Sequence, residues 1–349
     1  MPSVEFSVII VNFNGGDYLQ KAIDSLAGQT NRQFEVIVLD NNSADGSMDG
    51  LDTSGLPHVQ ILRESENHGF AKGNNLAAEK ARGRWLVLLN PDAAATPDWL
   101  SKLGDAARQY PDCRVFACTQ LDMHSEGILD GTGDAYLVFG FPWRGSFGKP
   151  RPALPPTGLC FSPCGAAAMY DRDVFLKHGG FDERFFCYCE DVDLGFRFQR
   201  EGLACIFVHD AVVEHAGSAI SGSISGFAAY HGTRNRIWTY FKNMPGLALW
   251  PTLPGHALLS LYLILRGLLN GTFVPVLRGT WHGFRDLPRI LSDRRWRSDR
   301  SLSVWALTRT MAWNPLRLSL RQPHIRPIPH TAAPAEADAP QEAGLQHRN

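Results

Sequence analysis

The sequence predicts a doubly wound, mostly parallel α/β sheet followed by a separate helical region. Through residues 6–100, short β-branched runs alternate with segments of helical periodicity, which is typical of a parallel sheet. The runs end on polar residues, at the edge of such a sheet where ligands bind. The composition then changes: residues 1–242 carry a net charge of −8, whereas residues 243–349 carry +7, with 13 Arg and no Lys.

The predicted elements follow from these periodicities. Helices are expected over residues 17–28 and 71–82, from Pro97, and from about Asp191. Residues 127–158 are rich in Gly and Pro with aromatic interruptions, which indicates a long binding loop or lid with a short hairpin. Strands are predicted at residues 6–11, 34–39, 59–62, 85–89 and 206–213.

Composition excludes several classes of protein. With 44% hydrophobic and 20% charged residues, the chain is globular, and its 349 residues predict about two domains. The net charge of −1 gives no reason to expect a nucleic-acid partner. Seven irregularly spaced cysteines favour a reducing cytoplasm over a disulfide framework, and their spacing disfavours a zinc site. No signal peptide is expected, because the first apolar run is only four residues long.

Three segments are predicted: a catalytic domain at 1–242, a helical region at 243–322 and a disordered tail at 323–349. Residues 243–265 carry no charge, but three prolines are expected to limit the unbroken helix to about 255–265. Beyond it, Arg and Trp alternate with apolar residues, which favours an interfacial helix on an anionic leaflet. The alternatives are a spanning helix or a helical subdomain that packs on the sheet or on a second subunit.

Two acidic groups are candidates for chemistry. Glu190, Asp191 and Asp193 raise one another's pKa, so that one of them in a partly apolar pocket would act as a general base. The alternative is a solvated helix N-terminus, where acids are favoured. Asp92, in the turn Asn90-Pro91-Asp92, offers a carboxylate to a hard cation that bridges a diphosphate, or forms an ordinary turn.

Further candidates stand at the ends of other strands. Asn12 and Asn14 follow the first strand, and Asp40 ends the second, where it accepts hydrogen bonds from a base or sugar hydroxyl or orders the next turn. His215 is a candidate metal ligand or phosphate donor, or a structural histidine. Arg234 and Arg236 either clamp phosphates or form a basic helix face.

Eight motifs in this order resemble the family 2 glycosyltransferases of the GT-A fold, particularly bacterial rhamnosyltransferase-like members. The resemblance covers about residues 5–240. The motifs are residues 7–15 (SVIIVNFNG), 38–47 (VLDNNSADGS), 67–75 (NHGFAKGNN), 88–92 (LLNPD), 165–169 (GAAAM), 180–186 (GFDERFF), 190–194 (EDVDL) and 215–218 (HAGS).

The resemblance implies an inverting transferase that uses a nucleotide-diphospho-sugar. Asp191, with Glu190 beside it, matches the catalytic base, and Asp92 matches the second acid of the family's Asp-x-Asp element. Asn90 replaces the first acid, which leaves one carboxylate for Mg²⁺ or Mn²⁺, with His215 as a further metal or diphosphate contact. The donor site implied by the resemblance comprises Val11, Asn12, Asn14, Asp40, Lys72, Asn75, Asn90 and Asp92.

The acceptor is expected between the sheet and the loop that contains Trp143 and Arg144. Gly165 would allow its close approach, and Arg234 and Arg236 would bind its phosphates. The expected donor is a dTDP- or UDP-sugar, with dTDP-rhamnose as the first choice, and the acceptor is a polyprenyl-diphosphate-linked sugar or a glycan. The enzyme would lie on the cytoplasmic side of the inner (plasma) membrane, peripheral or monotopic, in cell-envelope polysaccharide synthesis.

Two other functions remain open at this point. A nucleotidyltransferase on a similar sheet would need a basic, Gly-rich phosphate loop after the first strand, and residues 12–16 (NFNGG) are not basic. A non-catalytic membrane scaffold is supported only by Asn90 and opposed by the Glu190-Asp191 pair. The motifs do not set the oligomeric state, and a homo-oligomer stays open.

Overall fold

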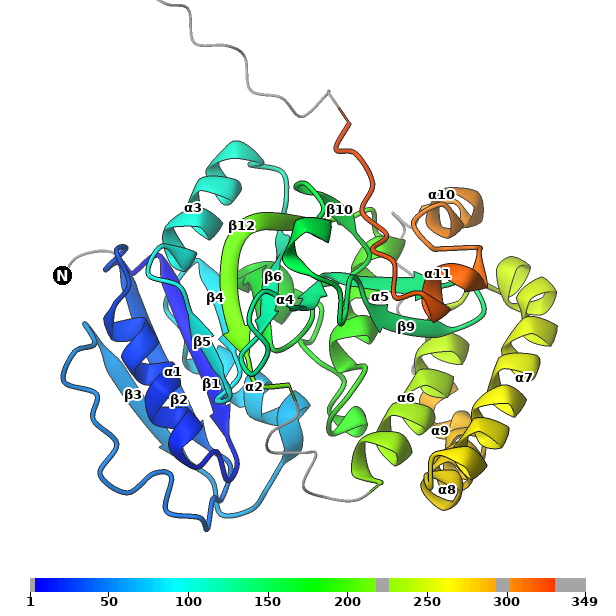
Figure 1. The fold of residues 1–349 in the computed structure, drawn as a ribbon, viewed down its shortest axis with the longest axis horizontal. Coiled ribbons are helices and arrows are strands. Elements are labelled where there is room, and N and C mark those ends of the chain that lie inside the picture. The colour runs from blue at the N-terminus through cyan, green and yellow to red at the C-terminus, as the bar shows by residue number, and fades with distance from the viewer. Residues whose placement is uncertain (1–3, 218–225, 293–301, 330–349) are drawn as a thin grey trace, which may run out of the picture.

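A single large sheet organises the computed structural model, which describes residues 4–217, 226–292 and 302–329 (Figure 1). Its strands lie in the order β10-β12-β6-β11-β4-β1-β2-β3. Six of them run in one direction: β1 (Phe6–Asn12), β2 (Phe34–Asp40), β3 (Val59–Arg63), β4 (Trp85–Leu89), β6 (Val115–Asp122) and β12 (Cys205–His215). The predicted fold class, a mostly parallel α/β sheet, is confirmed.

The remaining strands are antiparallel additions that the sequence did not reveal. β11 (Ala167–Asp171) lies between β4 and β6 and is antiparallel to both. β10 (Gly158–Cys160) and β5 (Ala93–Ala95) pair with β12, and β7 (Leu129–Thr132) pairs with β6. The strand β6 itself was also not predicted.

Helices cover both faces of the sheet because successive strand side chains point to opposite sides. Ile10 and Val38 pack with helices α1 (Asp17–Ala27) and α3 (Trp99–Gln109), whereas Ile9 and Ile37 belong to the core on the other face. That second core includes helices α2 (Gly69–Lys80), α4 (Arg172–Lys177) and α5 (Glu190–Arg200).

The predicted loop at residues 127–158 is more ordered than its composition suggests. It holds β7, a hairpin of β8 (Asp134–Leu137) and β9 (Phe141–Arg144), and the short 3-10 helix at Arg151–Ala153. The predicted hairpin is present. Asp134, at the start of β8, pairs with Arg144, at the end of β9.

The chain continues into six helices among the described residues: α6 (Phe227–Asn243), α7 (Gly246–Leu269), α8 (Phe273–Arg285), α9 (Leu287–Leu291), α10 (Val304–Thr308) and α11 (Pro315–Ser319). α7 and α8 lie at the end of the molecule away from β3 (Figure 1). The proposed boundary at residue 242 stays a prediction, and α6 runs across it.

The prediction that prolines shorten the helix of residues 243–265 is wrong. α7 is continuous through Pro251 and Pro254. A proline removes the hydrogen bond to the carbonyl four residues earlier, here those of Leu247 and Trp250. Both residues are exposed, so water can satisfy these carbonyls and the helix continues.

The start of the predicted tail is also wrong. Residues 323–329 run along the catalytic domain, where Arg326 exchanges two backbone hydrogen bonds with Leu159 of β10 and Ile325 contacts the core. Residues 330–349 of that tail, Ser218 of the last motif and residues 293–301 of the Arg- and Trp-rich stretch lie outside the described residues.

Candidate active site

A cleft of about 1070 Å³ opens at the carboxyl ends of β1 and β4, where the strand order reverses. Ligands bind in open α/β sheets at such switch points. The hairpin β8–β9 and the start of α5 form its other walls. Ten residues singled out in the sequence line it together: Val11, Asn14, Asn90, Asp92, Trp143, Arg144, Gly165, Glu190, Asp191 and His215.

Asp191 is held in a fixed position on the wall of this cleft. It is the second residue of α5, where the free N–H groups of a helix favour a negative charge. The backbone N–H of Gly165 donates to its Oδ2 at 2.7 Å, and that of Val192 donates to Oδ1 at 2.7 Å. Burial raises the pKa of Asp191, although these N–H groups stabilise its charged form. The carboxylate is thus aimed and more basic than an exposed one.

Two further carboxyls surround Asp191. Glu190 is 4% exposed, and burial followed by repulsion from Asp191 raises its pKa well above the ordinary range. Asp134 of β8 also lines the cleft, and burial followed by repulsion from Asp191 raises its pKa in the same way. Because three negative charges cannot share this space, Glu190 and Asp134 hold protons more readily than free carboxyls do. Sequence reasoning missed Asp134.

A second group of charged residues surrounds His215, which also lines the cleft. Its Nδ1 lies 2.8 Å from Asp130 Oδ2, and its Nε2 lies 3.3 Å from Asp92 Oδ1. Asp130 also pairs with Arg144. Burial opposes a charge on His215, but the hydrogen bonds with Asp130 and then Asp92 raise its pKa to about 9. Asp130 joins the predicted His215 to the predicted Arg144, and sequence reasoning missed it.

The chemistry of Asp92 and His215 fits a divalent cation that also binds substrate. Among the described residues, no three His, Cys, Asp or Glu side chains form a complete metal site. Asp130 on Nδ1 directs Nε2 of His215 towards Asp92, which is the arrangement of a metal-bound histidine. A diphosphate and water would complete the coordination, and binding would release the imidazole proton.

Four predicted donor-site residues lie behind the cleft instead of lining it. Asn12 donates to the hydroxyls of two serines, and Lys72 Nζ lies 3.2 Å from a histidine nitrogen. Asp40 Oδ1 accepts from a backbone N–H of the following turn at 2.9 Å. Asn75 Nδ2 donates to the carbonyl of Phe181 at 2.8 Å and thereby ties α2 to the segment before α5.

Arg234 and Arg236 also lie outside the cleft lining. Arg234 Nη2 donates to Phe185 O at 3.0 Å, and its guanidinium lies 4.2 Å from the centroid of the Trp238 ring. Arg236 is 2% exposed and donates to Gly140 O and Ser260 Oγ. Burial lowers the pKa of Arg236 to about 10. Their contacts hold elements together, and their proposed phosphate role stays a prediction.

The segment before α5 has an unusual backbone. Phe186, Tyr188 and Cys189 have φ angles of 65°, 72° and 65°, and all three line the cleft. Non-glycine residues in this region cost about 1–3 kcal/mol each and persist only when their surroundings hold them. The strain places Glu190 and Asp191 at the start of the helix that follows.

Asn235 holds this strained segment in place. Its side chain is fully buried, and Nδ2 donates to the carbonyl oxygens of Phe185, Cys187 and Tyr188 at 2.9, 2.9 and 2.7 Å. Asn235 stands between Arg234 and Arg236, the two residues that drew attention in the sequence. Of these three residues, the uncharged Asn235 is therefore the one that holds the cleft-lining segment in place.

A buried ionic network fixes α5 to α6. Asp193 is fully buried and accepts from Lys242 Nζ at 2.8 Å, Arg197 Nε at 3.1 Å and Asn243 Nδ2 at 2.7 Å. Lys242 Nζ also donates to Asp182 Oδ2 at 2.7 Å. The third acid of the predicted acidic group is thus structural, and it anchors the helix that carries Asp191.

The environment of Asp191 predicts a pH effect for Arg144→Gln. The charge of Arg144 lowers the pKa of Asp191, so its removal raises that pKa. If Asp191 is the base that the sequence predicts, it works only when deprotonated, so activity would be lost at a higher pH as the solution is acidified. We expect the acid limb of the kcat/KM–pH profile to move to higher pH, with Arg151→Gln, an exposed arginine in the 3-10 helix, unchanged. An acid limb that stays or moves down would contradict this electrostatic role.

Comparison with known proteins identifies the enzyme class. Residues 7–179 match the family model described as "Glycosyl transferase family 2". An N-acetylglucosaminyl-diphospho-decaprenol L-rhamnosyltransferase of Mycobacterium tuberculosis is 29% identical over 253 residues, covering 64% of this chain and 80% of the relative. The O-antigen biosynthesis protein RfbC of Myxococcus xanthus is 31% identical over 223 residues, covering 61% of this chain and 17% of the relative.

Solved structures show the same fold at low sequence identity. The mannosyltransferase PcManGT of Pyrobaculum calidifontis, in complex with GDP-Man and Mn²⁺, has a TM-score of 0.53 at 15% identity and covers 88% of each chain. The S. aureus TarS 1–349 complex with UDP-GlcNAc has a TM-score of 0.52 at 15% identity and covers 84% of this chain and 89% of that one. The chain is therefore a glycosyltransferase that carries a family 2 domain, at residues 7–179, in a GT-A fold.

Proposed function

We propose that the chain transfers a sugar, with inversion, from a nucleotide-diphospho-sugar to a polyprenyl-diphosphate-linked or glycan acceptor in cell-envelope synthesis. The observation that carries the proposal is the placement of Asp191, a half-buried carboxylate of raised pKa that lines a cleft together with Asp92 and His215. The name of the mycobacterial relative supports rhamnose as the sugar, and that of the myxobacterial relative supports an envelope glycan. The donor that we propose is dTDP-rhamnose.

In the proposed reaction, Asp191 removes the proton from the acceptor hydroxyl. The hydroxyl oxygen forms a bond to the anomeric carbon as the bond from that carbon to the diphosphate breaks on the opposite face. The nucleoside diphosphate leaves with the electron pair, and the configuration inverts. The N–H of Gly165 keeps the carboxylate of Asp191 aimed at this position.

The donor would lie along the carboxyl ends of β1 and β4. Val11 would contact the base, and Asn14 and Asn90 line the same stretch of the cleft. Asp92 and His215 would hold Mg²⁺ or Mn²⁺, which would neutralise charge on the leaving diphosphate when bound. Asn12, Asp40, Lys72 and Asn75 would act by shaping this wall from behind.

The acceptor would enter past the hairpin β8–β9. Trp143 and Arg144 stand on that side of the cleft, and Gly165 leaves room beside Asp191. A Cβ at Gly165 would lie 3.3 Å from Asp191 Oδ2 and 3.1 Å from the Phe70 ring, so glycine favours close approach. We propose that the acceptor is presented at the cytoplasmic face of the plasma membrane.

A thermal-shift panel of UDP, dTDP, GDP and CMP, each with and without Mn²⁺, tests the donor site. At about 100 times its dissociation constant, a ligand adds roughly 2.7 kcal/mol of stability. We expect dTDP or UDP to raise the melting temperature, more so with Mn²⁺, and Asp92→Asn to remove the Mn²⁺-dependent part. If none of the four stabilised the chain under either condition, the donor assignment would be lost.

The two alternatives are not favoured. The family match and the relatives are glycosyltransferases, which opposes a nucleotidyltransferase. A non-catalytic scaffold would have no need for a positioned, basic carboxylate beside Gly165, so the geometry of Asp191 opposes that reading.

A further inference from the structure

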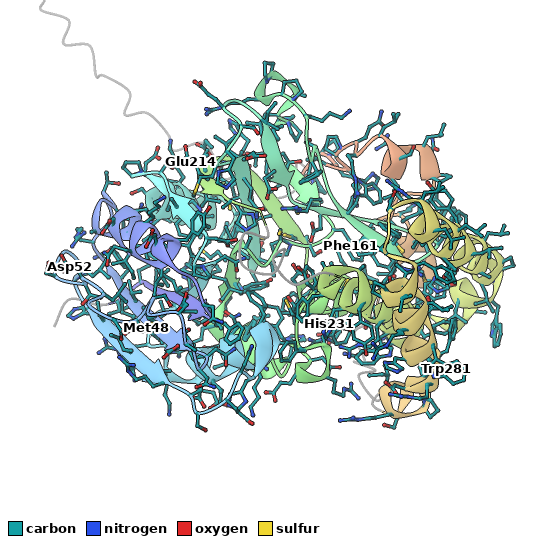
Figure 2. All side chains as sticks on the ribbon, turned by 60° about the horizontal axis from the view of Figure 1, so that its bottom comes forward. Met48, Asp52, Phe161, Glu214, His231 and Trp281 are labelled. Carbon is teal, nitrogen blue, oxygen red and sulfur yellow. The ribbon has the colours of Figure 1, made fainter. Side chains whose placement is uncertain are left out.

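The C-terminal helices expose an extensive apolar face. Trp281 marks it at the outer edge of the helical region, at the opposite end of the molecule from Asp52 (Figure 2). We call this surface the C-terminal apolar face, and its members range in exposure from 44% for Phe284 to 87% for Leu269. They are Leu247, Trp250, Leu258, Leu261, Tyr262, Leu265, Leu268, Leu269, Val274, Leu277, Trp281, Phe284, Trp305, Trp313, Leu316 and Leu320.

The charges on this surface are almost all positive. In the described residues from 246 onwards, Asp286 is the only acid, and it is paired with Arg285 at 2.7 Å. The exposed arginines are Arg266, Arg278, Arg285, Arg289, Arg309 and Arg317. Exposed Trp and Leu interspersed with Arg match the boundary of an anionic lipid leaflet. A second copy of the same face would instead bring like charges together.

The contacts of α7 decide between lying on a membrane and crossing it. Among the described helices, α7 is the one long and apolar enough to span a bilayer, with 24 residues. However, it is fixed to the catalytic domain by buried polar contacts at one-turn spacing. Thr252 Oγ1 lies 2.8 Å from Tyr240 Oη, and His256 Nδ1 lies 3.0 Å from Phe139 O.

The last of these contacts is that of Ser260, whose Oγ accepts from the buried Arg236 at 2.8 Å. Residues 261–269 remain beyond it, and nine helical residues extend about 14 Å. A bilayer core is about 30 Å thick. Spanning would therefore require α7 to withdraw Ser260 from Arg236, a guanidinium buried in the protein interior that would lose this hydrogen bond and keep the one to Gly140 O.

We propose that the C-terminal apolar face lies flat in the headgroup region of an anionic phospholipid leaflet, without crossing it. α7 then presents its outer face to lipid while its inner face stays bonded to the catalytic domain. The inference deepens the proposed function, because a lipid-linked acceptor would reach the cleft from that surface. The test measures binding to membranes and not sugar transfer, so a failure of this inference can be distinguished from a failure of the proposed chemistry.

Flotation of the full chain with vesicles tests the proposal. We expect binding to phosphatidylcholine–phosphatidylglycerol vesicles, weakened by salt, and much less binding to phosphatidylcholine alone. Leu265→Gln with Leu269→Gln should weaken binding by roughly tenfold or more, because two exposed leucines no longer enter the apolar boundary. Leu176→Gln, on α4 and also exposed, is the matched control and should bind normally.

Three results would overturn the proposal. One is equal binding to both kinds of vesicle or no loss in the double variant. Another is retention of the chain in membranes after an alkaline carbonate wash, which would indicate a spanning helix. The third is a stable dimer, measured by light scattering, that the double variant dissociates, which would assign the face to a second copy. Nucleotide-induced thermal shifts in the same variants report separately on the donor site.

Discussion

Asp191→Asn is expected to lower kcat for sugar transfer by about 10²–10⁴. The amide cannot take the acceptor proton, but it keeps the size of the carboxylate and an oxygen to accept from the Gly165 N–H. The affinity for the nucleotide should survive, since Asp191 lies on the acceptor side of the cleft in the proposed reaction. Transfer kinetics and the nucleotide-induced thermal shift measure the two effects separately.

The fold of this variant should not suffer. Burial raises the pKa of Asp191, which means that the charged form costs folding free energy at neutral pH, and asparagine removes that cost. However, the amide Nδ2 would face one of the two backbone N–H groups that now donate to Asp191, which offsets this gain. The melting temperature should therefore stay close to that of the parent chain. Glu190→Gln is the matched control: Glu190 holds its proton more firmly, so an uncharged amide should change transfer much less. Transfer by Asp191→Asn within tenfold of the parent rate would assign the base elsewhere.

Lys242→Met is expected to lower the free energy of unfolding by about 3–5 kcal/mol. Lys242 is 3% exposed and neutralises two carboxylates, Asp193 and Asp182, which would keep their charges inside the protein after its removal. Urea unfolding measures the loss. Lys102→Met is the control, because Lys102 pairs with Asp210 at 3.3 Å on the surface, where such pairs contribute about 1 kcal/mol or less.

The same variant should also unfold at a higher pH on acidification. Burial opposes the charge on Asp182, but hydrogen bonds from Arg184 and the charge of Lys242 lower its pKa below the ordinary value. The stability that this shift provides is present above the pKa of an unfolded aspartate and is lost as the pH falls. Without Lys242, the pKa of Asp182 is lowered less, so less of this stability is available. If Lys242→Met matched Lys102→Met in urea and in acid, the network would have no anchoring role.

The central strands and their polar ends were predictable because a buried strand and its following turn leave a local pattern. Ile9 and Ile10 belong to one continuous apolar run, and Asn12 and Asn14 mark its end. β11 escaped prediction because its pairing with β4 and β6 is set by distant segments. Such antiparallel insertions follow from topology, which one strand's sequence does not contain.

The residues of the candidate site also divide into those that a local motif predicts and those that distant pairings bring into place. Asp191 and His215 stand in recognisable motifs, whereas Asp130 and Asp134 lie in a Gly-rich stretch whose pattern assigns no role to a single acid. Asp134 reaches the cleft on the hairpin β8–β9, and Asp130 reaches His215 on β7, which pairs with β6. The structural role of Asn235 was not predicted, because it depends on hydrogen bonds to three carbonyls about fifty residues earlier in the chain.

The position of α6 limits where recombination between related chains can join one catalytic domain to another C-terminal region. Asn235 and Lys242 secure the catalytic side of α6, while Arg236 and Tyr240 secure α7 on its other side. A recombination joint placed before α6 would separate the cleft from its own support. A joint after Asn243 would leave that support intact. An exchange of the C-terminal region therefore spares the support of the cleft only when the joint lies downstream of this helix.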